Sequence, residues 1–218
     1  RTGISVGDYP IDHHHKKNPA APQHLDFYSV PSYNIPLGSL IPHNVIGLIV
    51  CDKSISVSNV VNGTTRLQPV VLLTGQAAGM LAAVCGRKNK EARAIPVREV
   101  QQDLLNANAM IMPYIDAGIN HPHFKSIQKI GAAGILRGKG IPNKWANQTW
   151  FYPDSLVSVA ALVENFQSFD YTIGSRGEEQ LSIGDAADMI YTIAAISTRR
   201  IKNNAAIFSP QEKFKKYV

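Results

Sequence analysis

The residues best suited to chemistry form the segment Gly63-Thr64-Thr65-Arg66-Leu67-Gln68-Pro69, which reads as a tight turn leading into a helix. Pro69 suits the first helical turn, where its missing N–H costs nothing. The unpaired N–H groups of that turn and the helix dipole favour negative charge, and Arg66 places a permanent cation just before them. Residues 63–69 are therefore a candidate anion site supplied mostly by backbone.

The helix that this segment opens is predicted over residues 69–85, with Gly86 as its cap. Its apolar sequence is interrupted by small residues, Gly75, Ala77, Ala78 and Gly79. Small residues let another backbone or a flat ligand come close to a helix. The same pattern is also typical of a closely packed core helix, because an isolated glycine in a helix usually has a packing reason. The sequence leaves both interpretations open.

A second group of chemically capable residues follows Asp12, where His13, His14 and His15 are consecutive. Neighbouring side chains in an extended segment point to opposite faces, so one metal ion would rarely collect all three histidines. A single histidine held by Asp12 suits an acid–base or hydrogen-bonding role. A solvated loop without a chemical role is the equal alternative, and we predict no metal site.

These groups need elements that position them. Residues 1–9 alternate weakly and predict a strand, whereas the continuous apolar run from Val45 to Cys51 predicts a strand buried in a parallel sheet. A polar loop over 52–58 then leads to the helix. Open α/β sheets bind their ligands at such a place. Residues 97–105 predict a short amphipathic helix.

The pattern of residue types changes after the connector at residues 106–120, where we expect a domain boundary. A helix from Phe124 to a turn at Gly134 is predicted, then a loop marked by Gly138 and Gly140. Ser155 or Ser158 is expected to cap a helix through Phe166, and Ser182 another helix. The aromatic residues between Trp145 and Tyr152 suit the core of a small helical domain or, alternatively, a sugar-stacking surface.

Composition narrows the function classes. The chain has 218 residues and a formal net charge of +6, but its basic residues are scattered and not interleaved with aromatics, so we predict no nucleic-acid partner. The two cysteines make neither a disulfide framework nor a metal site. No uninterrupted apolar run reaches the ~18 residues typical of a transmembrane helix, so no membrane span is predicted.

Residues 1 to about 85 resemble the C-terminal part of FAD-dependent oxidoreductases, a family that includes bacterial proteins with a xanthan lyase label. The resemblance is carried by five ordered strings: residues 9–14 (YPIDHH), 35–42 (IPLGSLIP), 54–58 (SISVS), 63–69 (GTTRLQP) and 74–79 (TGQAAG). It implies an α/β fold, the incomplete C-terminal part of an FAD/NAD(P)-binding Rossmann-like fold, followed by a small mostly α-helical domain. The implied domains are 1–94, a helix and connector at 95–120, and an S-layer-homology-like accessory domain at 121–218.

The resemblance also assigns roles by position. Arg66, Leu67, Gln68 and Pro69 would face the pyrimidine edge of the flavin of FAD, with Gly75 and Gln76 in the close packing beside it. The matching strings add Ser39 and Ser56 to the cofactor-binding residues. Asp12 and His14 would lie on the substrate side as proton-transfer groups for hydride transfer at the flavin, and the substrate would be an unknown small molecule or carbohydrate.

Two departures from the family pattern qualify these roles. Asp52-Lys53 stands where the family usually has Gly-Arg, and no Gly-x-Gly-x-x-Gly motif, which holds the FAD pyrophosphate, occurs in the chain. The resemblance therefore implies a missing N-terminal part of the same protein, without which this piece should bind FAD weakly or not at all.

Other interpretations stay open. Residues 155–161 lack the Thr-Arg-Ala-Glu string of S-layer-type units, so cell-wall anchoring is doubtful. A non-catalytic module that binds carbohydrate or cell-wall polymer is the alternative function. A polysaccharide lyase follows only from the label on relatives, because no suitable base and carboxylate-neutralising group stand out. The compartment is open, with a periplasmic or extracytoplasmic site among the expectations.

Overall fold

The computed structural model describes residues 2–12, 29–143 and 146–167, together with residues 180, 182, 186, 189 and 191. The chain forms two compact units, Arg1–Asp154 and Ser155–Val218. Unit 1 contains the following elements: β1 (Gly3–Gly7), β2 (Tyr33–Pro36), the 3-10 helices η1 (Leu37–Leu40), η2 (Asp52–Ser54) and η3 (Ala92–Ala94), α1 (Asn59–Thr65), α2 (Gln68–Lys88), α3 (Val97–Asn106), α4 (Phe124–Ala133), β3 (Lys139–Asn143) and β4 (Ala146–Trp150). Unit 2 contains α5 (Val159–Gln167).

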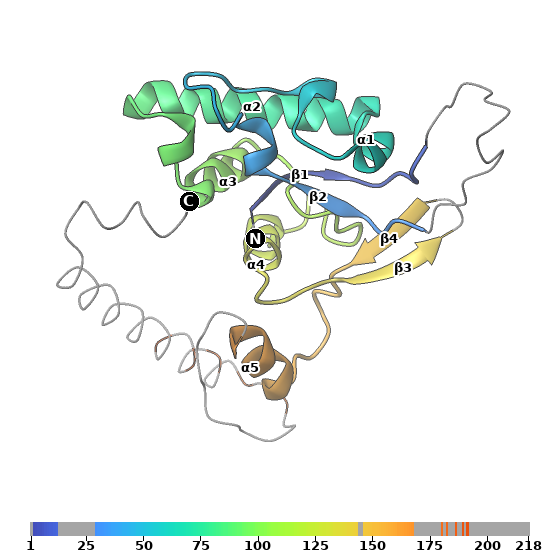
Figure 1. Ribbon diagram of the computed structural model, residues 1–218. Helices are drawn as coiled ribbons and strands as arrows, with labels where there is room; N and C mark the ends of the chain where they lie inside the picture. Colours follow the sequence, from blue (N-terminus) through green and yellow to red (C-terminus); the bar gives the residue numbers. More distant parts are fainter. Residues whose placement is uncertain are drawn as a thin grey trace, which may run out of the picture. The chain divides into compact units, whose positions relative to one another are not determined.

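A two-stranded antiparallel ribbon, β1–β2, lies at the centre of unit 1, with α2 along one side of it (Figure 1). All five residues of β1 are buried, which confirms the strand predicted over residues 1–9. Gly7 of β1 is paired with Tyr33 of β2. A Cβ on Gly7 would lie 2.5 Å from the Tyr33 ring, so the absence of a side chain at Gly7 leaves room for this ring.

Helix α2 has two different faces, and each matches one interpretation of its small residues. Its buried face packs on β1 and α3 through Val70, Thr74, Ala77, Ala78, Leu81 and Val84. Gly75 and Gly79 lie off this face, and a Cβ built on either would have no neighbour within 4 Å. The alanines therefore serve close packing, whereas the two glycines leave the helix backbone open along its outer side.

The C-terminus of α2 differs from the prediction. The helix continues through Gly86 to Lys88 and ends at Asn89, whose φ and ψ are both 50°. The Asn89 N–H donates to the carbonyls of Cys85 and Gly86. Asparagine tolerates this left-handed conformation better than most residues, so the predicted cap at Gly86 is wrong by three residues.

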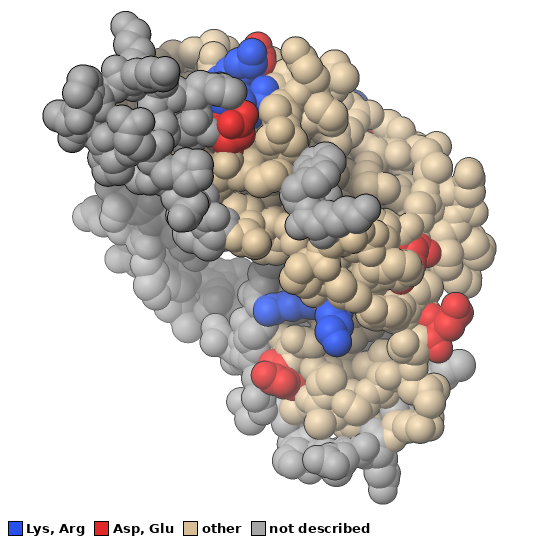
Figure 2. Space-filling model, turned by 90° about the vertical axis from the view of Figure 1, so that its right-hand side faces the viewer, with Lys and Arg blue, Asp and Glu red and all other residues tan. Residues whose placement is uncertain are grey.

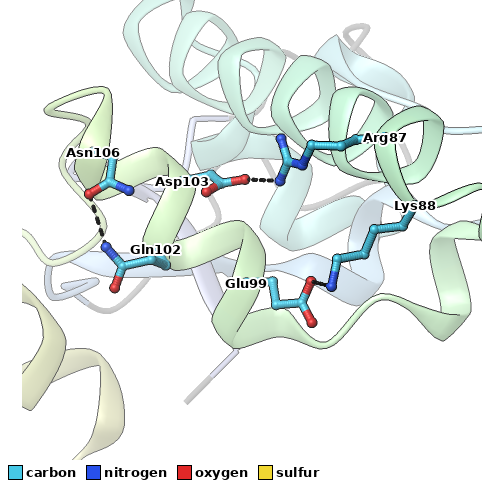
Figure 3. A network of polar contacts seen from close by, with 6 residues as sticks. All are labelled: Arg87, Lys88, Glu99, Gln102, Asp103 and Asn106. Atoms are coloured by element: carbon cyan, nitrogen blue, oxygen red, sulfur yellow. Dashed lines mark hydrogen bonds and ion pairs between the residues drawn. The ribbon is translucent and has the colours of Figure 1, made fainter.

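Ion pairs join the end of α2 to α3 (Figure 3). Arg87 pairs with Asp103, and Lys88 pairs with Glu99. These side chains are partly exposed, so the ion pairs add little to the folding stability. Their main effect is on the orientation of α3 relative to α2. The predicted amphipathic helix over 97–105 is confirmed, and its buried residues Val100, Leu104 and Leu105 supply the apolar contact.

The predicted buried strand from Val45 to Cys51 is wrong. These residues adopt no regular structure, Gly47 has a φ of 75°, and Ile46 is 78% exposed. A continuous apolar run suits a strand that has neighbours in a parallel sheet. Among the described residues no such sheet exists, because both sheets are two-stranded and antiparallel, so the run has no ladder to join.

The second half of unit 1 contains α4, which packs on α3, and the β3–β4 hairpin. The predicted helix from Phe124 is confirmed, and it ends at Gly134 with a φ of 78°. The predicted loop at Gly138 and Gly140 is wrong in part, because Gly140 pairs with Thr149 inside the hairpin. Cross-strand pairing outweighs the low strand propensity of glycine here.

The fold is thus a mixture of helices and small sheets. The Rossmann-like class stays a prediction, because the described residues include no parallel sheet. Unit 1 extends to Asp154, beyond the predicted connector at 106–120. The division into 1–94, 95–120 and 121–218 remains a prediction about functional domains.

In unit 2, α5 confirms the helix predicted to end at Phe166. The Ser158 hydroxyl accepts a hydrogen bond of 3.2 Å from the Ala161 N–H, so Ser158 is the cap, not Ser155. Of the helix predicted from Ser182, the described residues show a bond from Ala186 N–H to the Ser182 carbonyl. The remainder of that helix, and Trp145 of the aromatic cluster, lie outside the described residues.

One helix in the described part of the chain, α2, has the length and apolar composition needed to cross a membrane. Core helices of soluble proteins pass the same test, and α2 packs a polar residue, Thr74, on β1 through its hydroxyl contact with Ser5. The absence of a membrane span stays a prediction.

Candidate functional site

A hydrogen-bond network fixes the turn between α1 and α2. Thr64, which is 3% exposed, lies at its centre. Its hydroxyl is 2.6 Å from the Tyr9 carbonyl and 2.8 Å from the Tyr33 hydroxyl. Tyr33 in turn donates to the Thr64 carbonyl over 2.9 Å. The network therefore joins the segment after β1, strand β2 and helix α1 at one point.

The same turn brings together Asp12 and Arg66. The Arg66 guanidinium donates to the Asp12 carbonyl over 2.8 Å, and its Nη2 is 3.5 Å from the Asp12 carboxylate. The Asp12 N–H donates to the Gly63 carbonyl over 3.3 Å. Both side chains are about one-third exposed, at 31% for Arg66 and 39% for Asp12. Backbone hydrogen bonds as well as charge therefore hold the Arg66–Asp12 pair. Both side chains remain partly exposed to solvent.

The surroundings of Tyr33 keep its hydroxyl protonated, so that it donates a hydrogen bond. Burial raises its pKa, the charge of Asp8 adds to the rise, and the hydrogen bond with Thr64 opposes it. Asp8 itself accepts two contacts, of 3.1 and 3.2 Å, from the Asn147 N–H in β4. Tyr33 keeps its proton at neutral pH and so has a structural role in the turn.

The N-terminus of α2 is open beside this pair. Val71 makes the first bond of the helix, from its N–H to the Leu67 carbonyl. The earlier amides of the turn therefore need partners outside the helix. Gln68 and Pro69 are exposed, so this end of α2 is not sealed by the rest of unit 1.

The remaining predicted site residues lie in two further places. Ser39 is buried and Ser56 is exposed, and the Ser56 N–H donates to the Ser39 carbonyl over 2.8 Å. Gly75 and Gln76 follow along α2, about 10 Å from its start at a rise of ~1.5 Å per residue. His14 lies outside the described residues.

Sequence reasoning missed Thr64 and Tyr33 as site-forming residues. Thr64 lies within residues 63–69. That segment was predicted as a site because of its backbone amides and Arg66, and not because of the Thr64 side chain. Tyr33 carries no local signal, because only the β1–β2 register brings its ring over Gly7 and its hydroxyl to Thr64. The buried contact of 3.3 Å between the hydroxyls of Ser5 and Thr74 was also unpredictable, because it joins residues 69 positions apart.

Charge on the visible face of the molecule is sparse. In Figure 2 most of the described surface is uncharged, and the basic and acidic residues are scattered without a continuous basic patch. Among the described residues no three histidine, cysteine or acidic side chains come together as a metal site would require. The nucleic-acid and metal predictions stay predictions, since His13–His15 fall outside that part of the chain.

Comparison with known protein families gives one match. Residues 1–104, slightly less than half of the chain, match the family described as FAD dependent oxidoreductase. The match includes β1 through most of α3 and all the predicted site residues. It does not extend to residues 105–218, and the xanthan lyase label and the S-layer-type tail remain predictions. No curated protein and no solved structure gives a significant match.

This family implies an FAD cofactor, and the structure allows a test of fit. The exposed start of α2, the adjacent Arg66 and the open backbone at Gly75 and Gly79 suit one edge of a flat, electron-rich ring. No Gly-x-Gly-x-x-Gly loop is available for the pyrophosphate. The residues present therefore fit the flavin end of FAD and not its pyrophosphate.

Proposed function

We propose that this chain is the C-terminal portion of an FAD-dependent oxidoreductase and supplies the wall that faces the flavin. The observation that carries the proposal is the open N-terminus of α2 beside the Arg66–Asp12 pair, inside the segment that matches the family. FAD, when bound, supplies the transfer of electrons to or from the substrate. The missing dinucleotide-binding motif would come from an N-terminal part of the same protein.

In this proposal the chain's own residues have distinct tasks. The first amides of α2 and the Arg66 guanidinium stabilise negative charge at the pyrimidine edge of the ring. Asp12 orients Arg66 through its carbonyl and carboxylate. His14, two residues further on, would move a proton on the substrate side, with Asp12 as the other candidate. Ser39, Ser56, Gly75 and Gln76 would complete the cofactor wall.

The test uses the full-length parent protein. We expect it to show flavin absorbance when purified, and a colourless protein that takes up no added FAD would contradict the proposal. Arg66→Gln should lower the midpoint potential of the bound FAD by about 20 to 40 mV, since loss of one nearby cation is worth about 1 to 2 kcal/mol and 30 mV is about 1.4 kcal/mol for two electrons.

A matched control is available at the other end of α2. Arg87→Gln removes the same charge, but Arg87 is paired with Asp103 and lies 21 residues after Arg66, so the potential should not change. An equal shift in both variants would mean that the potential follows net charge and that Arg66 has no special place at the flavin.

A carbohydrate-binding role has one observation in its favour. The rings of Trp150 and Tyr152 stack at a centroid distance of 5.9 Å with an interplanar angle of 17°, and Tyr152 is 41% exposed. Asp116 accepts hydrogen bonds from the Phe151 and Tyr152 amides and so fixes this pair. Binding of a soluble glucan oligosaccharide that Tyr152→Ala abolishes would support the role, and no binding would remove it.

A further inference from the structure

The end of the β1–β2 ribbon that carries Tyr33 is enclosed from two sides. Tyr33 faces the α1–α2 turn, where its hydroxyl donates to the Thr64 carbonyl. Side chains alternate along an extended chain, so the preceding residue, Ser32, points to the other side of the ribbon. There its hydroxyl donates to the Asn147 carbonyl in β4 over 3.4 Å. In Figure 1, α1 and the β3–β4 hairpin accordingly lie on opposite sides of the end of β1.

Asn147 holds both chain segments at this end of the ribbon. Its backbone N–H donates to the two carboxylate oxygens of Asp8, just after β1, over 3.1 and 3.2 Å. Its side-chain amide donates to the Val30 carbonyl, and its own carbonyl accepts from Ser32, just before β2. We call these contacts the Asn147 clamp. The bond to Asp8 is charge-assisted and therefore stronger than a bond between neutral groups.

The segment from Asp8 to Asp12 runs from this clamp to the candidate flavin site. Along it, the Tyr9 carbonyl accepts from the Thr64 hydroxyl over 2.6 Å, and the Asp12 carbonyl accepts from the Arg66 guanidinium over 2.8 Å. Four residues of chain span at most about 14 Å even when fully extended. A displacement of Asp8 is therefore transmitted to Asp12 through a short segment whose other end is bonded to Arg66.

Asp8 has a second link to the same site, through Tyr33. Burial raises the pKa of Tyr33, and the charge of Asp8 adds to the rise. Asp8 is thus close enough to help keep the Tyr33 hydroxyl protonated, and that hydroxyl donates to Thr64. The clamp and the Thr64 network share Asp8 as a neighbour.

The clamp joins two parts of the sequence. Asp8, Val30 and Ser32 belong to the residues that match the FAD-dependent family, whereas Asn147 lies beyond the match, so the match assigns it no role. Both parts belong to unit 1. The hairpin thus contacts the family-matched segment where the chain leaves β1 toward Asp12.

We propose that Asn147 is a positioning residue of the candidate flavin site. Through Asp8 it fixes the segment that places Asp12 against Arg66. This inference rests on the proposed function, since it concerns how the Arg66 guanidinium is held beside the flavin. Asn147 itself contacts neither cofactor nor substrate in this proposal. The region after residue 104 then contributes to the geometry of the site.

A purely structural staple is the competing interpretation. Such a staple would hold the hairpin on the ribbon and would affect folding stability alone. The positioning role is favoured because the Arg66 guanidinium bonds to the backbone of Asp12 as well as lying near its carboxylate. The path of the chain after β1, which the clamp restrains at Asp8, therefore decides where the partner of Arg66 lies.

The test is a double-mutant cycle of Asp8→Ala with Arg66→Gln in the FAD-loaded full-length parent protein. Asp8→Ala removes the acceptor of the Asn147 N–H. The shift in midpoint potential that it causes should differ by about 10 to 20 mV between the parent and the Arg66→Gln background. A charge that acts only at a distance would shift both backgrounds equally, and a staple would shift neither.

A matched pair in β4 probes the clamp from the other side. Asn147→Ala loses the side-chain bond to Val30 and keeps the backbone bond to Asp8. We expect it to change the potential in the same direction as Asp8→Ala in the cycle, by about half as much. Gln148→Ala is the control, because the side chain of Gln148 contacts only Trp150 of its own strand, over 3.3 Å, and it should leave the potential unchanged.

Hydrogen exchange gives a readout that does not depend on the flavin. The Asp12 amide donates to the Gly63 carbonyl over 3.3 Å, and its exchange should be at least about threefold faster in Asp8→Ala than in the parent. If Asp8→Ala fails to fold, Asn147→Ala carries the same measurement. Unchanged exchange of Asp12, or equal potential shifts in the two backgrounds of a flavin-loaded protein, would overturn this inference and leave the proposed function standing. A colourless parent that takes up no FAD would overturn both.

Discussion

The two sides of the β1–β2 ribbon differ in how a tyrosine hydroxyl is satisfied, with Tyr33 half-buried and Tyr114 fully buried. On one side the Tyr33 hydroxyl donates to the Thr64 carbonyl and is contacted by the Thr64 side chain. On the other side the hydroxyl of Tyr114 has no partner among the described residues. A satisfied tyrosine adds stability and fixes a turn, whereas an unsatisfied one lowers stability unless something else binds it. The difference separates a part of the molecule in which a tyrosine hydroxyl fixes a turn from one in which close packing leaves a hydroxyl unsatisfied.

The largest effect on the free energy of unfolding is expected at Gly138, whose backbone packs against the Tyr114 ring. A Cβ on Gly138 would lie 2.5 Å from the Tyr114 ring and 2.7 Å from the Trp150 carbonyl oxygen, and the carbonyl cannot move without opening the hairpin. Gly138→Ala should therefore lower the free energy of unfolding by about 3 kcal/mol, measured by urea denaturation.

Gly140 provides the control for that substitution. It is two residues further along, within β3, and a Cβ there would have no neighbour within 4 Å. Gly140→Ala should leave the free energy of unfolding within about 0.5 kcal/mol of the parent. Equal losses in the two variants would show that the Tyr114 ring is not packed against Gly138.

High pH should destabilise the fold through Tyr114. Its pKa is about 12 in the folded chain and near 10 when unfolded. Between these values the unfolded chain has released the proton and the folded chain still holds it, so the free energy of unfolding falls as pH rises, by up to about 2 to 3 kcal/mol. Urea denaturation from pH 9 to pH 12 would measure this slope.

Other groups also ionise in that range, and Tyr33 contributes in the same direction because its pKa is raised too. The informative quantity is the difference between the parent and Tyr114→Phe, which lacks the titrating hydroxyl. The parent should lose more stability than the variant between pH 10 and pH 12. Parallel pH curves for the two proteins would contradict the burial of this hydroxyl.

A third substitution probes the satisfied side. Thr64→Val removes the hydroxyl that contacts the Tyr9 carbonyl and Tyr33, and Thr64 is 3% exposed. Because two half-buried partners lose their contact with this hydroxyl, we expect a loss of about 2 kcal/mol in the free energy of unfolding. Thr65→Val is the matched control, since the equally buried Thr65 bonds only to the Val61 carbonyl of its own helix.

The Thr65→Val variant should lose less than about 1 kcal/mol, because a bond from a helical threonine to the carbonyl four residues earlier is local and adds little. Thermal unfolding monitored by circular dichroism would rank the two variants. A larger loss for Thr65→Val than for Thr64→Val would mean that the turn is held by helix α1 itself and not by its links to β1 and β2.

The contrast also shows what a sequence can predict. Helix α2, helix α3, helix α4 and strand β1 were predictable because periodicity, Pro69 and Gly134 are local signals. The run from Val45 to Cys51 failed, because a buried strand needs partners that no local pattern supplies. Arg66 and Asp12 were singled out from the sequence, but their contact depends on the path of the chain after β1. Tyr33 and Tyr114 acquire their opposite roles from strand register and packing alone. No spacing in the sequence predicts the role of either residue.

The smallest effect is the most direct test of the comparison, because the same substitution should have opposite signs on the two sides. Tyr33→Phe removes a donor from the Thr64 carbonyl and should lower the free energy of unfolding by about 1 kcal/mol. Tyr114→Phe removes a buried hydroxyl that has no partner and keeps the ring against Gly138, so it should raise that free energy by about 1 kcal/mol. Urea denaturation at neutral pH would give both values. Destabilisation by both substitutions would mean that Tyr114, like Tyr33, already has its partner within the fold.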